Sequence, residues 1–70
     1  MITIEVVDSR GRPVSGADVQ ISWRSWTHSK GRTDSRGRVS WNVSPGRGTV
    51  YVDGRKVYDG EVRGSLRVRK

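Results

Sequence analysis

The residue types that carry out catalysis are sparse in this sequence. It has one histidine, His28, and no cysteine among its 70 residues. A serine nucleophile needs a general base held by a third group, and no Gly-x-Ser-x-Gly elbow surrounds any serine. A zinc site needs three or four nitrogen, sulfur or oxygen ligands, which one histidine does not supply. Walker A and Gly-x-Gly-x-x-Gly loops are absent as well. The sequence therefore predicts no enzyme, no metal site and no cofactor.

Basic residues are the abundant chemical groups. Lysine and arginine number 14 against 7 aspartates and glutamates, which gives a formal net charge of +7. This balance favours polyanionic partners, namely nucleic acid, phosphorylated surfaces or acidic proteins. The alternative is that the charge only keeps a small domain soluble. Composition alone does not choose between these two interpretations.

Two arrangements of arginine are candidates for a polyanion-binding surface. Alternation along the last expected strand places Arg63, Arg67 and Arg69 on one face, where they could follow a phosphate backbone. Arg12 and Arg38 lie at turns, where arginines beside an exposed Trp26 or Tyr51 could form a surface for phosphates and bases. The alternative for all five arginines is a solvated surface without a ligand.

Most of the chain alternates apolar and polar residues, as half-buried β-strands do. We expect strands over residues 2–7, 18–24, 38–43, 49–52, 55–58 and 61–69, with a short polar edge strand within residues 25–32. No segment has helical periodicity. The sequence thus predicts one domain, residues 1–70, with an all-β fold: a small antiparallel sandwich of six or seven short strands. The expected core is Ile2, Ile4, Val6, Val19, Ile21, Trp23, Val39, Trp41, Val43, Val50, Val52, Val62, Leu66 and Val68.

Turn signals separate these strands. The pentapeptide Asp8–Arg12 recurs, residue for residue, as Asp34–Arg38. An aspartate that accepts backbone hydrogen bonds and a glycine with positive φ would explain both copies, and a duplicated binding loop is the alternative. Asp53-Gly54 predicts a type I′ hairpin turn, and we expect further turns at Lys30-Gly31 and Asp59-Gly60. The expected structural turn residues are Asp8, Gly11, Asp34, Gly37, Asp53 and Gly54.

Two motifs carry a family resemblance. Val7-Asp8-x-x-Gly11-x-Pro13-Val14-x-Gly16-Ala17-x-Val19 resembles the opening of carboxypeptidase regulatory-like, or transthyretin-like, β-sandwich domains. Thr33-Asp34-x-x-Gly37-x-Val39 is similar to that family's second signature, and bacterial Ig-like adhesin domains share a looser version of the pattern. The resemblance implies an Ig-like or prealbumin-like sandwich without catalytic residues. This chain is shorter than such domains usually are, and the segment after Ser44 lacks their aromatic-rich strand.

These observations favour a non-catalytic β-sandwich binding or structural module that contacts another macromolecule. A protein is the favoured partner, and open strand edges also suggest weak self-association. The alternative is a nucleic-acid-binding protein that uses an Arg-rich face. No stretch approaches the ~20 apolar residues of a transmembrane helix, and the N-terminus lacks the features of a signal peptide. We therefore expect no membrane insertion, with the cytoplasm as the default location.

Overall fold

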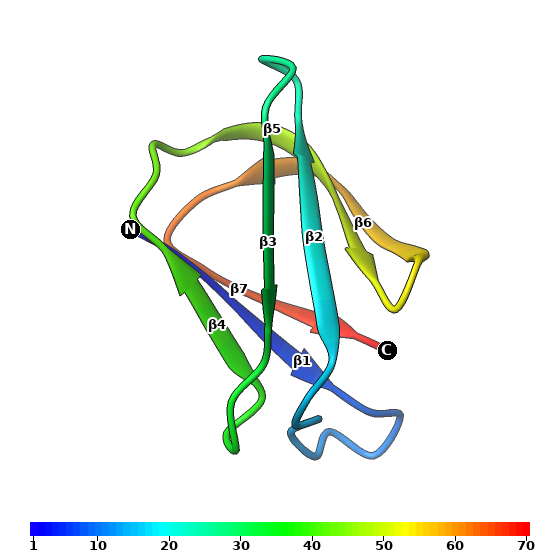
Figure 1. The fold of residues 1–70 in the computed structure, drawn as a ribbon. Helices are drawn as coiled ribbons and strands as arrows, with labels where there is room; N and C mark the ends of the chain where they lie inside the picture. Colours follow the sequence, from blue (N-terminus) through cyan, green and yellow to red (C-terminus); the bar gives the residue numbers. More distant parts are fainter.

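The computed structural model describes residues 1–70 and consists of seven strands without a helix (Figure 1). The strands form two sheets, one of three strands in the order β4-β1-β7 and one of four in the order β3-β2-β5-β6. The expected all-β, two-sheet class is thereby confirmed. The strands are β1 (Ile2–Val7), β2 (Asp18–Trp23), β3 (His28–Arg32), β4 (Arg38–Trp41), β5 (Gly46–Val52), β6 (Arg55–Val62) and β7 (Ser65–Arg69).

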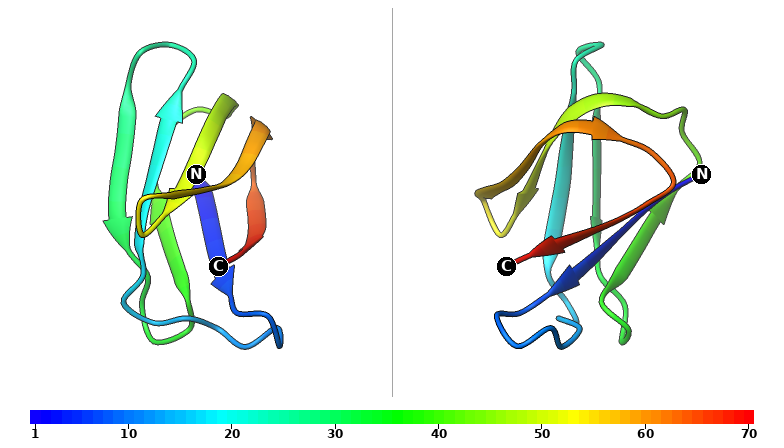
Figure 2. Two further views of the ribbon diagram at one scale, coloured as in Figure 1. Left: turned by 90° about the vertical axis from the view of Figure 1, so that its right-hand side faces the viewer. Right: turned by 180° about the vertical axis from the view of Figure 1, so that it is seen from behind.

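One strand pair departs from the expected antiparallel arrangement. β7 runs parallel to β1, with Thr3 opposite Ser65 and Val7 opposite Arg69. The chain leaves the four-stranded sheet at the end of β6 and turns at Gly64, whose φ is 60°, before it joins the other sheet (Figure 2). Because β6 and β7 belong to different sheets, they do not form a hairpin, and β7 is free to lie along β1 in the same direction.

The core lies between the two sheets and is almost wholly aliphatic. Trp23 is its one aromatic member, and its Nε1 donates a hydrogen bond of 2.9 Å to Ser29 Oγ, also buried. Every buried polar side-chain atom has such a partner. The cluster consists of Ile2, Ile4, Val6, Ala17, Val19, Ile21, Trp23, Val50, Val52, Val62 and Val68.

Four expected core residues are less buried than predicted. Val43 is exposed because β4 ends at Trp41, so the alternation does not continue to residue 43. Val39, Trp41 and Leu66 are half-buried, since β4 and β7 are edge strands and their inward side chains are covered from fewer sides. Trp41 Nε1 also donates to Lys30 O (3.0 Å), which keeps the rim of its ring near solvent.

The two identical pentapeptides form the same turn. Gly11 N–H donates to Asp8 O (3.0 Å) and Asp8 N–H donates to Arg12 O (2.9 Å), and residues 34–38 repeat both bonds at 3.0 and 2.9 Å. Gly11 and Gly37 have φ of 80° and 75°. This is a three-residue hairpin loop, a type I turn followed by a left-handed residue. Turn chemistry therefore accounts for the repeat.

A third expected turn is confirmed and two others are wrong. Asp53 and Gly54 have φ of 51° and 82° and join β5 to β6, as a type I′ turn requires. Lys30-Gly31 instead lies within β3, which is the predicted edge strand. Asp59-Gly60 lies within β6, where Gly60 faces Gly48 across the strand pair and the Tyr58 ring covers it. Flanking strand pairing overrides the local turn signal at both places.

Candidate functional site

The tip of the β2–β3 hairpin repeats the loop of the two pentapeptides, with a tryptophan in the glycine position. Trp26 N–H donates to Trp23 O (3.1 Å), and Trp23 N–H donates to Thr27 O (2.9 Å). These bonds correspond to those that Gly11 and Gly37 make in their turns. Trp26 has a φ of 72°, within a few degrees of the glycine values. The third loop thus places a bulky L-residue where the geometry favours glycine.

Trp26 is also the most exposed large apolar side chain of the protein, at 93%. A left-handed conformation costs an ordinary L-residue roughly 1–2 kcal/mol, and an exposed indole recovers almost none of this through burial. Trp26 therefore does not stabilise the fold, either through its backbone conformation or through packing. Strain that folding does not require is found preferentially at functional positions.

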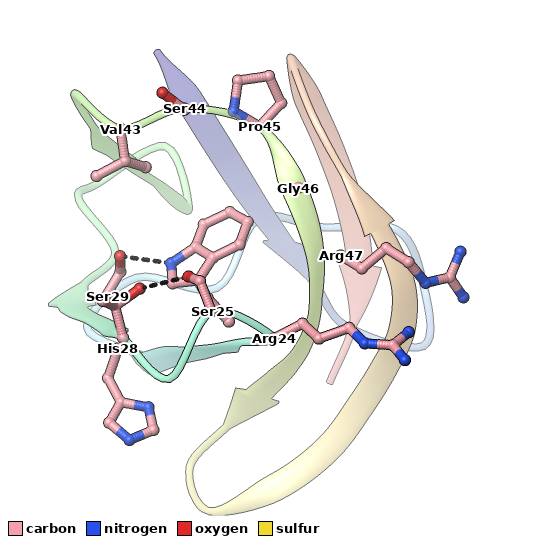
Figure 3. Close-up of a pocket in the computed structure, with 11 residues that line it drawn as sticks. Arg24, Ser25, His28, Ser29, Val43, Ser44, Pro45, Gly46 and Arg47 are labelled. Atoms are coloured by element: carbon pink, nitrogen blue, oxygen red, sulfur yellow. Dashed lines mark hydrogen bonds between the residues drawn. The ribbon is translucent and has the colours of Figure 1, made fainter.

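Two arginines lie next to this tip. Arg24 follows directly after β2, and its N–H donates to Arg47 O of β5 (2.9 Å), which places the two residues opposite each other. Figure 3 shows their side chains extending in the same direction, toward solvent. Neither takes part in an ion pair, although Glu61 lies opposite Arg47 in β6, because Glu61 pairs with Arg63 instead (3.3 Å). Like charges directly opposite each other are unfavourable in a sheet, so these two side chains do not stabilise the fold.

The surface is hollowed around these residues. One hollow of about 550 Å³ extends toward the segment Val43–Arg47, and a second of about 560 Å³ extends toward Thr49 and Asp59. Both are lined by Trp23, Arg24, His28 and Arg47, and Trp26 lines the second. Trp23 itself is buried and contributes to the lining of both. We call Arg24, Trp26, His28 and Arg47 the hairpin-tip site.

The arginines singled out from the sequence do not form one ladder. Arg63 precedes Gly64 and lies outside β7, so it does not share a strand with Arg67 and Arg69. Arg67 and Arg38 flank Glu5 from β7 and β4, at 3.2 and 4.0 Å. The expected placement of three arginines on one face of one strand is wrong. A left-handed glycine interrupts the strand, and a carboxylate from β1 pairs with one of the arginines. Arg12 and Arg38 are the last residues of the two pentapeptide turns. Polyanion binding by these residues stays a prediction.

Three carboxylates with a lowered pKa belong to turns. Backbone N–H groups of Arg12 and Arg10 donate to Asp8, which lowers the pKa of that carboxyl, and those of Arg38 and Arg36 do the same for Asp34. The pKa of Asp53 is lowered by Lys70, whose Nζ lies 2.7 Å from Oδ2, and by the Asp18 N–H. The sequence assigned all three to turns, and their bonds explain why. No three histidine, aspartate or glutamate residues gather where they could hold a metal ion.

The sequence contained part of the signal for the hairpin-tip site. Trp26 stood out as an exposed candidate, but Arg24 and Arg47 did not, because only the pairing of β2 with β5 brings these two arginines together. The two-sheet fold is compatible with the β-sandwich that the motifs implied. Comparison with models of known protein families finds no match for the chain, and comparison with curated proteins finds none either. The structure has no helix long and apolar enough to span a membrane.

Proposed function

We propose that this protein is a non-catalytic binding module that contacts another protein through the hairpin-tip site. The observation that carries the proposal is Trp26, which is 93% exposed and held at a φ of 72° at the end of a hairpin. Tryptophan and arginine are the residues most enriched among those that dominate binding energy at protein interfaces. Here an exposed tryptophan lies beside two arginines that form no ion pair.

The second hollow, which Trp26 helps to line, gives a partner room to fit. A partner that covers the hairpin tip would bury the indole of Trp26 and fill this hollow. An acidic or hydrogen-bonding group on the partner would meet Arg24 and Arg47. The cost of ordering is small, because strand pairing and a backbone-bonded turn already fix the position of the tip.

Affinity capture with matched variants tests this proposal. Immobilised wild-type protein, Trp26→Gly and the control Arg10→Gln are each exposed to extract of the source cells, with and without nuclease treatment. We expect a stoichiometric protein partner on wild type and Arg10→Gln, and its loss from Trp26→Gly, whose backbone is retained. Equal retention by all three would contradict binding through the tip, and loss of the partner on nuclease treatment would favour nucleic acid.

Self-association is the related possibility, since β3, β4, β6 and β7 are all edge strands. Unpaired edges are templates for another strand. Sedimentation at high micromolar concentration measures it directly. A dimer that persists in Trp26→Gly would assign the contact to an edge, whereas a dimer lost in that variant would make a second copy the partner at the tip.

We also infer that the chain belongs to the transthyretin-like or carboxypeptidase regulatory-like type. Support comes from the two motifs that resemble the family, whose Asp8, Gly11, Asp34 and Gly37 all occupy turns. An experimental structure that superimposes on such domains with the same strand order would support this. A different strand order would restrict the likeness to the turns.

A further inference from the structure

The outward face of the four-stranded sheet has a row of four side chains across it. Lys30 lies opposite Gln20, Gln20 opposite Tyr51, and Tyr51 opposite Lys56. Along β2 and β5 these positions alternate with buried valine and isoleucine, so the side chains point away from the core. Tyr51 therefore lies on an inner strand of this face, with a lysine on each of the two edge strands.

The cations of this face have no ion-pair partners. The protein has four ion pairs, and their cations are Arg38, Arg63, Arg67 and Lys70. None of them comes from the five cations of the face, which are Arg24, Lys30, Arg32, Arg47 and Lys56. The face also has three carboxylates: Glu61 pairs with Arg63, Asp59 accepts a hydrogen bond from Thr49 Oγ1 (3.2 Å), and Asp18 lies opposite Arg32 without forming an ion pair. The face thus carries five basic side chains against three carboxylates, which leaves it positively charged.

We propose that this outer face binds single-stranded nucleic acid, with a base stacked on Tyr51 and phosphates held by Lys30 and Lys56. Neighbouring strands lie about 4.8 Å apart, so Lys56 is about 5 Å and Lys30 about 10 Å from Tyr51 across the row. Long lysine side chains can reach phosphates on either side of a base over such distances. Surfaces of this kind, a basic track with an aromatic platform, bind single strands without strong sequence preference.

The aromatic platform favours a single strand over other polyanions. Bases inside a duplex are stacked on one another and cannot lie on Tyr51, and an acidic peptide gains nothing specific from the ring. Gln20, Ser22 and Thr49 are half-buried around Tyr51 and offer hydrogen-bonding groups to base edges. This proposal goes beyond the protein contact at Trp26 and does not depend on it.

Titration with a 15-nucleotide oligo-dT, followed by fluorescence anisotropy from 20 to 200 mM salt, tests the proposal. With about four phosphate contacts the logarithm of the binding constant should fall with the logarithm of salt concentration with a slope near −3. Lys30→Gln combined with Lys56→Gln should flatten the slope by about 1.4. The matched control, Arg10→Gln with Arg36→Gln, removes the same charge from the two pentapeptide turns, outside the outer face, and should leave the slope near the wild-type value.

Tyr51 variants separate stacking from charge. Tyr51→Phe keeps the ring and should bind within about twofold of wild type, whereas Tyr51→Thr should weaken binding by about 5- to 100-fold. Melting temperatures of both variants verify folding. Trp26→Gly should bind the oligonucleotide within about threefold of wild type. The nucleic-acid proposal and the protein-contact proposal can therefore fail independently of each other. No binding below about 100 μM at 20 mM salt, equal losses in both charge pairs, or equal affinity for polyglutamate would overturn the proposal.

Discussion

Replacing Trp26 by glycine should stabilise the protein. The left-handed conformation costs an L-residue roughly 1–2 kcal/mol, and glycine removes that cost at a φ of 72°. The greater freedom of glycine in the unfolded chain takes back roughly 0.5–1 kcal/mol. Little apolar burial is lost, since the indole is 93% exposed. The net gain has a central value of about 0.75 kcal/mol, which should raise the melting temperature by roughly 3–6 °C in a domain of this size.

Thermal unfolding followed by circular dichroism measures this shift, and Trp26→Ala is its matched control. Alanine removes the same ring but keeps a Cβ in the left-handed region, so its melting temperature should stay close to wild type. If the melting temperature of Trp26→Ala rose as much as that of Trp26→Gly, the ring and not the backbone conformation would be the unfavourable feature. A melting temperature lowered by glycine would refute the reasoning, because it would mean that Trp26 stabilises the fold through packing.

The remaining predictions concern turns, the half-buried tryptophan and pH. Gly11→Ala should cost about 1 kcal/mol, and Gly37→Ala more, because its Cβ would lie 2.7 Å from a backbone oxygen whereas that of Gly11 meets nothing within 4 Å; equal losses would contradict this. Trp41→Ala should lower the free energy of unfolding by about 2 kcal/mol, less than the roughly 3–5 kcal/mol lost when a fully buried tryptophan is replaced by alanine. Denaturant unfolding measures this loss. Because folding lowers the pKa of Asp8 and Asp34, their contribution is complete above the usual value of 3.8 and is lost as pH falls through the folded pKa. The melting temperature should therefore fall as the pH is lowered below about 4. The fall should be smaller in the double variant Asp8→Asn with Asp34→Asn.

Local chemistry made much of the fold predictable from the sequence. Strict alternation identified β1 and β2 and their buried faces, since one face of each strand packs into the core. The aspartate and glycine of the pentapeptides identified their turns because the hydrogen bonds lie within five residues. Both features are encoded in short stretches of sequence.

Features that depend on distant strands were not predictable in this way. Asp59-Gly60 has the composition of a turn, yet pairing with Gly48 keeps it within a strand. The neighbour of Arg67 is Glu5, which is 62 positions away in sequence. Nothing in the sequence around Trp26 marks a left-handed position, because the pairing of β2 with β3 imposes the turn there. The hairpin-tip site thus emerges only from the assembled sheet.

Calorimetric titration of the captured partner into purified wild type and Trp26→Gly tests the central claim most directly. The account predicts that the glycine variant melts at a higher temperature and binds at least about 30-fold more weakly, the equivalent of the roughly 2 kcal/mol lost at a dominant interface residue. Equal affinity of the two proteins for the partner would contradict the claim that Trp26 is the binding anchor.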